Sequence, residues 1–323
     1  MSRHWGIRNV VCAIALCATC FFAVTASRAE EPFPKAEPIN YLIAFSAGGI
    51  SDIFARAQQP LLEKELGQKV IISYKVGAGG AVAWSELVRS KPNGYYTAGF
   101  NIPHIILQPL ERKDAGYTTS QIKPVMLFMD TPCVLAVRAD SPYRTLEDLV
   151  RAQKEKPGSI IIGGCGNATS GHIASVLLNK LTQARFTYIP FPGTADLPPA
   201  LLGNHVTAIM AFTTEAAQYS RDMRVLAVAS MERDPKIDAP TFRELGYDFV
   251  EGSIRGLAVP PETPQERIDV LYKACAAVNA DPGFAKKVTE MGFTLMDLDP
   301  KASQEFIDKK VEAYKAILKE LKK

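Results

Sequence analysis

The chain has few cysteines outside its first residues and lacks sequence repeats and low-complexity tracts. Of its six cysteines, three lie within the first 20 residues, and Cys133, Cys165 and Cys275 are far apart in the sequence. Three distant cysteines in apolar or glycine-rich surroundings argue against a disulfide framework. The absence of repeats of about 20 to 50 residues excludes solenoid and propeller architectures.

The chain also has little net charge once residues 1–29 are set aside. Lys plus Arg number 37 against 34 Asp plus Glu, and residues 1–29 hold three of the arginines and no acidic residue. The remaining 294 residues are formally neutral, so the sequence gives no support to nucleic-acid binding. Their length suits two α/β lobes.

Residues 1–29 have the features of a secretory signal peptide. Two arginines precede an apolar run over 10–26, and Ser27-Arg28-Ala29 forms a small-x-small cleavage site. We predict cleavage after Ala29 and export of a soluble protein. An uncleaved anchor is the alternative, although the run is short for a membrane span of about 20 residues.

Nucleotide-binding and metal-binding motifs are absent. The segment Gly77–Gly80 lacks the third glycine of the dinucleotide fingerprint, and Gly166–Gly171 is followed by His-Ile where a phosphate-binding loop requires Lys and then Ser or Thr. The three histidines beyond the leader show no metal-ligand spacing. We therefore expect no cofactor and no metal.

The segment 41–67 predicts a strand, a glycine loop and a helix. The apolar run Tyr41–Phe45 precedes Gly48–Gly49, and a helix is predicted from Ser51 or Asp52 up to Gly67. Glycines before a helix start expose backbone N–H groups next to the positive end of the helix dipole. Such a loop is suited to hold an anion.

The same arrangement recurs later in the chain. The further copies are Val70–Tyr74 before Gly77–Gly80, Ile160–Ile162 before Gly163–Gly171, and Tyr188–Phe191 before Pro192–Thr194. One copy is an ordinary connection of any α/β protein. Four copies predict an anion site assembled from several backbone loops.

Short apolar runs alternate with helices along the whole chain, which is typical of parallel sheets covered by helices. We predict helices over 81–89, 146–153 with Thr145 as its cap, 173–181, 198–202 closed by Gly203, 264–280, and from 302 onward. A new block opens at Ser141-Pro142 and the pattern changes again at Gly252. These changes predict a second lobe built like the first.

One catalytic alternative stays open. Gly49 to Ile53 begins like the nucleophile elbow of a serine hydrolase, but Ile53 stands where the last glycine belongs. A secreted serine-type hydrolase would use Ser51 or Ser170 with His172.

Seven segments, taken in order, resemble the extracytoplasmic solute receptors of tripartite tricarboxylate transporters, known as the Bug family. They are FSAGGISDIFAR, LGQKVIISYKVGAGGAVA, KPNGYYT, SPYRTLEDL, GCGNATSGHIA, PFPGTADLPPALLGN and RGLAVPPETP. The resemblance covers nearly all of the chain after the leader.

The resemblance implies a class II periplasmic-binding-protein fold, an α/β fold of two lobes joined by two crossing strands with the ligand cleft between them. Lobe 1 would comprise residues 38–137 and 252–323, and lobe 2 residues 138–251. The protein would be a periplasmic, monomeric receptor and not an enzyme. It would bind a small di- or tricarboxylate and deliver it to a membrane permease of one large and one small subunit. A ligand-sensing receptor for a signalling partner is an alternative role.

The resemblance also implies a set of ligand-binding residues. They are Ser46, Ala47, Gly48, Gly49, Asp52, Gly79, Asn101, Asn167, Ala168, Thr169, Ser170, His172, Thr194, Phe212, Thr213 and Arg255. We expect Asp52 to brace its loop, since a free carboxylate there would repel an anion. Arg255 takes a place that is often aromatic in the family. We predict that backbone loops hold the anion, in which case Arg255 is peripheral. The alternative is that Arg255 is a buried partner of a carboxylate of the ligand.

Overall fold

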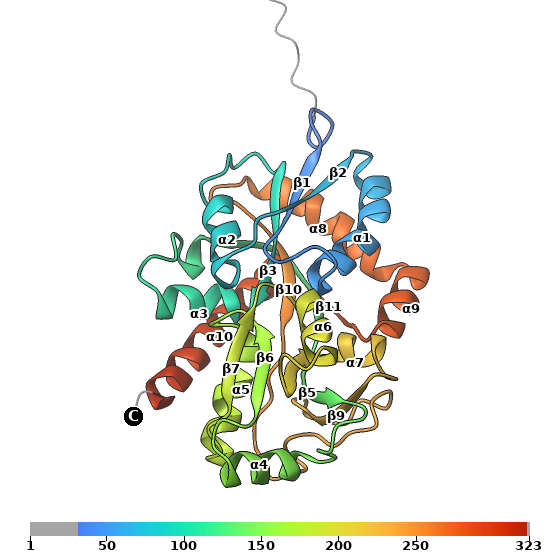
Figure 1. Ribbon diagram of the computed structural model, residues 1–323. Helices are drawn as coiled ribbons and strands as arrows, with labels where there is room; N and C mark the ends of the chain where they lie inside the picture. The colour runs from blue at the N-terminus through green and yellow to red at the C-terminus, as the bar shows by residue number, and fades with distance from the viewer. Residues whose placement is uncertain (1–31, 322–323) are drawn as a thin grey trace, which may run out of the picture. The chain divides into compact units, whose positions relative to one another are not determined.

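The computed structural model describes residues 32–321, and those from Phe33 onward belong to one compact unit. The predicted signal peptide and its cleavage after Ala29 lie outside the described residues. Two mixed β-sheets form the framework, and Figure 1 shows their strands in two separate groups.

The first sheet has six strands in the order β11-β4-β10-β3-β1-β2. Its strands are β1 (Ile39–Ile43), β2 (Val70–Tyr74), β3 (Tyr96–Ile102), β4 (Lys123–Asp130), β10 (Ile254–Val259) and β11 (Thr294–Leu298). Strand β1 pairs in parallel with β2 and β3, as the alternation of strands and helices predicted. Strand β10 is antiparallel to β3 and β4, and β11 is antiparallel to β4.

The second sheet has five strands in the order β7-β6-β8-β5-β9. They are β5 (Cys133–Arg138), β6 (Ile161–Cys165), β7 (Thr187–Phe191), β8 (Ala208–Phe212) and β9 (Met223–Val228). Strand β6 is parallel to β7 and β8, whereas β5 is antiparallel to β8 and β9. Because parallel strands end at one edge, the loops after β6, β7 and β8 gather together, as do those after β1, β2 and β3.

Two crossing segments join the sheets and run side by side. Thr131 N–H donates to Ser253 O at 3.2 Å, and Ser253 N–H donates to Thr131 O at 2.9 Å. This arrangement confirms the expected class II fold. The lobe boundary predicted between residues 137 and 138 falls inside β5, which belongs to the second sheet, because the apolar run 133–138 gave no local sign of a sheet change. The chain leaves the first sheet before Cys133.

Helices cover both sheets. They are α1 (Ile50–Leu66), α2 (Ala81–Leu87), α3 (His104–Glu111), α4 (Leu146–Glu155), α5 (Ser170–Thr182), α6 (Leu197–Leu202), α7 (Thr213–Gln218), α8 (Gln265–Ala280), α9 (Pro282–Glu290) and α10 (Pro300–Leu321). Short 3-10 turns occur at η1 (Ala78–Gly80), η2 (Thr119–Gln121) and η3 (Thr194–Asp196). None of the helices within residues 32–321 is long and apolar enough to cross a membrane.

Local signals placed several helix ends correctly. Thr145 caps α4 by accepting Asp148 N–H at 3.2 Å, and Gly203 follows the end of α6. Helix α1, in contrast, starts at Ile50 with Gly49 as its N-cap, before the predicted start at Ser51 or Asp52.

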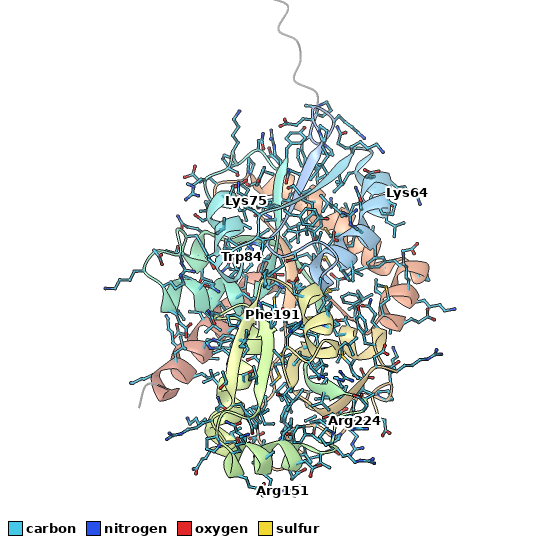
Figure 2. The ribbon with its side chains drawn as sticks, viewed as in Figure 1. Lys64, Lys75, Trp84, Arg151, Phe191 and Arg224 are labelled. Carbon is cyan, nitrogen blue, oxygen red and sulfur yellow. The ribbon has the colours of Figure 1, made fainter. Side chains whose placement is uncertain are left out.

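Aromatic packing fixes the position of α1 on the first sheet. The ring of Phe54 on α1 stacks on Phe128 of β4 with centroids 5.0 Å apart, and Phe284 and Phe293 pack edge-on against it. Burying one such side chain stabilises the fold by about 1.5 to 3 kcal/mol. On the other side of the sheet, Trp84 of α2 is buried and donates to Gly99 O at 3.0 Å (Figure 2).

Candidate functional site

The loop between β1 and α1 meets the second lobe, and several of its backbone donors already have partners. Gly48 adopts φ +77°, a left-handed conformation that favours glycine. Its N–H donates to Asp52 Oδ2 at 2.7 Å, and Gly49 N–H donates to a carbonyl within the loop at 3.2 Å. Ile50 N–H donates to Thr194 Oγ1 at 3.0 Å. Thr194 therefore accepts the first N–H group of α1 from the other lobe.

Asp52 holds this loop in place. Its carboxylate is buried and accepts hydrogen bonds from Gly48 N–H and from the Tyr74 hydroxyl, the latter at 2.6 Å. Arg56 Nε forms an ion pair with the same group at 2.8 Å. With these partners the carboxylate braces the loop.

The loop after β7 packs directly on the loop after β1. Ser46 is half-buried and its hydroxyl donates to Asp196 Oδ2 at 3.5 Å, whereas Ala47 is exposed. A Cβ added to Gly193 would lie 2.9 Å from Ser46 Cβ. The two lobes are thus in contact at this point.

The loop before α5 is stabilised within its own lobe. Thr169 caps the helix by accepting His172 N–H at 3.4 Å, and Ala168 N–H donates to His172 Nδ1 at 3.1 Å. The His172 ring lies 4.9 Å from the ring of Tyr188, and burial lowers the pKa of His172. His172 therefore acts as a neutral brace of the loop.

A second contact between the lobes involves Gly79 and Asn167. Gln108 Nε2 on α3 donates to Asn167 O at 2.6 Å, and the backbone of Gly79 packs against both residues. The side chain of Asn167 is exposed. A third contact is the hydrogen bond from Thr213 Oγ1 to Gly292 O at 2.9 Å. The predicted residues of different loops are thus brought to one interface.

The remaining predicted residues are buried at this interface. Asn101 Nδ2 donates to Ser253 Oγ at 3.2 Å, and Ser170 Oγ has no hydrogen-bond partner among the described residues. Phe212 closes β8 with its ring against the guanidinium of Arg255, 5.2 Å from centroid to Cζ. Arg255 is only 4% exposed, so of the two alternatives for this residue the side chain is buried and not peripheral.

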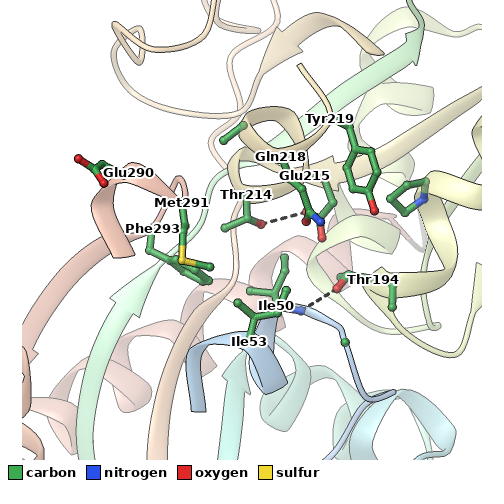
Figure 3. A pocket seen from close by; sticks show the side chains of 14 residues that line it. Ile50, Ile53, Thr194, Thr214, Glu215, Gln218, Tyr219, Glu290, Met291 and Phe293 are labelled. Atoms are coloured by element: carbon green, nitrogen blue, oxygen red, sulfur yellow. Dashed lines mark hydrogen bonds between the residues drawn. The ribbon is translucent and has the colours of Figure 1, made fainter. Parts of the chain in front are cut away.

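A cleft of about 530 Å³ opens between the lobes next to Gly48 and Thr194 (Figure 3). Ile50, Ile53 and Phe293 form its apolar wall on the first lobe, and α7 faces them from the second lobe. A second hollow, of about 760 Å³, contains Gly79, Asn167 and Ala168. Some of the predicted ligand-binding residues therefore line one of these two hollows, and the others are buried where the lobes meet.

Sequence reasoning missed Glu215, which lines the first cleft. Its Oε2 accepts Phe212 N–H at 3.2 Å. It also accepts the Thr214 hydroxyl at 3.0 Å, the bond drawn in Figure 3. Burial raises the pKa of Glu215 to about 7. The sequence signal for Glu215 was its position, three residues after the end of a predicted strand. An acidic residue at that position is also common in an ordinary helix cap.

Within residues 32–321, no group of three His, Cys, Asp or Glu side chains is placed to hold a metal ion. Cys133, Cys165 and Cys275 are buried free thiols. The hydrogen bond needed for a serine nucleophile is also missing in this part of the chain, because His172 Nδ1 is occupied by a backbone N–H and Ser170 Oγ has no partner.

Comparison with known proteins identifies the family. The model described as "Tripartite tricarboxylate transporter family receptor" matches residues 54–322. The chain belongs to this family. The resemblance found in the sequence is confirmed, and with it the expectation that the protein is a substrate-binding receptor and not an enzyme.

Relatives of this receptor match it over nearly their full length. The "UPF0065 protein in gbd 5′ region" of Cupriavidus necator is 28% identical, with 99% of this chain and 98% of that protein covered. The periplasmic binding protein BugD is 28% identical with a TM-score of 0.84, covering 88% of this chain and 97% of that chain. An R. palustris protein solved with adipate is 22% identical with a TM-score of 0.85, covering 90% and 98%, and shows the shared fold.

Proposed function

We propose that this receptor binds a small di- or tricarboxylate between its two lobes. The observation that carries the proposal is the cleft of about 530 Å³, which both lobes line and which lies beside the N-terminal end of α1. Its volume falls in the range of about 300 to 1,000 Å³ that is usual for small-molecule sites. The positive end of a helix dipole favours an anion at this place.

Lobe closure would enclose the ligand. The contacts from Ile50 to Thr194 and from Gln108 to Asn167 join one lobe to the other, so they form only when the lobes are together. A ligand that touches both lobes adds to these contacts and shifts the population toward the closed arrangement.

Membership in the family supports a proposal for the biological role. We propose that the protein is exported to the periplasm after cleavage behind Ala29 and acts there as a monomer. It would deliver its ligand to a membrane permease of one large and one small subunit. The family description supports the link to a transporter.

A thermal-shift panel tests the proposed ligand class. Succinate, adipate and citrate are added to the purified protein, with glucose as a neutral control. A ligand at a hundredfold excess over its Kd stabilises the folded state by about 2.7 kcal/mol, so a binding acid raises the melting temperature clearly. A panel in which no di- or tricarboxylate raises it, or in which glucose does so equally, would contradict the proposal.

A further inference from the structure

Arg255 is a buried cation at the interface of the lobes. It lies on β10, opposite Asn101 of β3 and Met129 of β4, and is 4% exposed. Burial lowers the pKa of Arg255 only to about 10, so the side chain stays charged at neutral pH. A buried charge without a partner is strongly unfavourable, and its presence here requires an explanation.

Among the residues that the structure describes, only one nitrogen of this guanidinium donates hydrogen bonds. Nη1 donates to Thr131 Oγ1 and to Ser253 O, the latter at 3.0 Å. Nε is buried without a partner, and no hydrogen bond of the described residues involves Nη2. Among residues 32–321, Arg255 takes part in no ion pair within 4.0 Å.

The unoccupied nitrogens form one edge of the side chain. With Nη1 bound, Nε–H and the neighbouring N–H of Nη2 point in the same direction. These two donors match the two oxygens of a carboxylate, which arginine binds through parallel hydrogen bonds. The free edge therefore has the geometry of a carboxylate-binding fork.

The nearby carboxyl groups of Glu215 and Asp130 offset this charge only in part. Burial raises the pKa of Glu215 to about 7 and also raises the pKa of Asp130, and neither carboxyl group reaches Arg255 within ion-pair distance. His104 is buried with Nδ1 unpaired, and burial together with the charge of Arg255 holds its pKa well below the usual range. Arg255 is thus the positive centre of the interface.

We propose that the free edge of Arg255 binds a second carboxylate of the ligand, so that the receptor selects dicarboxylates over monocarboxylates of equal chain length. This inference rests on the proposed function, in which the first carboxylate lies near the start of α1. The other explanation is a structural arginine whose edge is satisfied by one water, since Arg255 does not line the cleft of about 530 Å³ and borders instead a hollow of about 10 Å³ beside Ser51 of α1.

Titration calorimetry separates the two explanations. The probes are succinate with butyrate and adipate with hexanoate, two pairs in which a methyl group replaces one carboxylate. They are titrated into the wild type, Arg255→Met and the control Arg151→Met. Arg151 is an exposed residue of α4, paired with Asp148 and drawn away from the lobe interface in Figure 2, so its replacement removes the same charge at the surface.

The wild type and Arg151→Met should bind at least one diacid about thirtyfold or more tightly than its monoacid. Arg255→Met should lose this preference and retain its affinity for the monoacid within about threefold. A preference that persists in Arg255→Met, or an equal loss for both acids, would overturn the inference. Equal binding of both acids by the wild type would overturn only the dicarboxylate selection, whereas no binding of any probe would overturn the proposed function as well.

Thermal melting and a second variant guard against misfolding. Thr131 Oγ1 donates to Ser253 O at 3.1 Å independently of Arg255, so Arg255→Met should melt no lower than the wild type. If it melts lower, Arg255→Lys decides, because lysine keeps the charge and lacks the fork. A diacid preference reduced at least tenfold in Arg255→Lys supports the inference, and an unchanged preference overturns it.

Discussion

Glu251 is a buried carboxyl group on the second crossing segment. Its oxygens accept hydrogen bonds from Gly252 N–H at 3.0 Å and from the Tyr314 hydroxyl at 3.1 and 3.2 Å. Burial raises its pKa to about 8. The folded protein therefore holds a proton that the unfolded chain releases at lower pH, and the free energy of unfolding falls as the pH rises toward 8.

Glu251→Gln should remove this pH dependence. Each pKa unit corresponds to about 1.4 kcal/mol, so between pH about 5.5 and 8.5 the wild type should lose on the order of 3 kcal/mol more stability than the variant. Urea denaturation at both pH values measures the difference. The exposed Glu312→Gln on α10 serves as the control and should follow the wild type. Parallel pH profiles for the wild type and Glu251→Gln would show that Glu251 does not titrate as stated.

At the scale of elements, the loop between β2 and α2 closes on the loop before α5 through a glycine. Gly79 has φ +63°, and a Cβ there would lie 2.1 Å from Gln108 Nε2 and 2.6 Å from Asn167 O. Gly79→Ala should push the lobes apart and weaken diacid binding at least about tenfold, or 1.4 kcal/mol.

Gly158→Ala is the matched control for this prediction. Gly158 has φ +86°, and a Cβ there meets nothing within 4 Å, so the substitution brings similar backbone strain without a contact between lobes. Calorimetry should show unchanged affinity for Gly158→Ala. Equal affinities of the two variants would mean that the Gly79 contact plays no part in closure.

The elements that the sequence predicted were those with local causes. The glycine loops, the cap at Thr145 and the parallel pairing of β1 with β2 all follow from residues close together in the chain. The start of α1 at Ile50 was not predicted, because the partner of its first N–H group is Thr194, far along the sequence. The segment through Thr131, where the chain crosses from the first sheet to the second, joins strands that pair antiparallel with their neighbours. The alternation of strands and helices in the sequence predicts only parallel pairing.

The candidate site was predictable in its loops and not in its charges. The burial of Arg255 depends on the packing of β10 between β3 and β4 and against Phe212 of the other lobe. The place of Glu215 in the cleft depends on how α7 faces α1. Both features arise from tertiary packing. A local sequence motif can point to such a residue, but it does not show whether the residue is buried or what surrounds it.

At the scale of the whole molecule, we propose that the two lobes enclose one small carboxylate. The contacts at Thr194, Asn167 and Thr213 hold the lobes together from three loops, and Arg255 supplies an unpaired charge at their interface. A ligand enclosed in this way should be retained long enough to be detected as part of an intact complex.

Native mass spectrometry of the purified protein with succinate, adipate or citrate tests this claim most directly. We predict that at least one of these acids adds the mass of a single molecule per chain, and that the added mass disappears when the complex is activated by collision. Spectra that show only the free protein at millimolar concentrations of all three acids would contradict a carboxylate receptor.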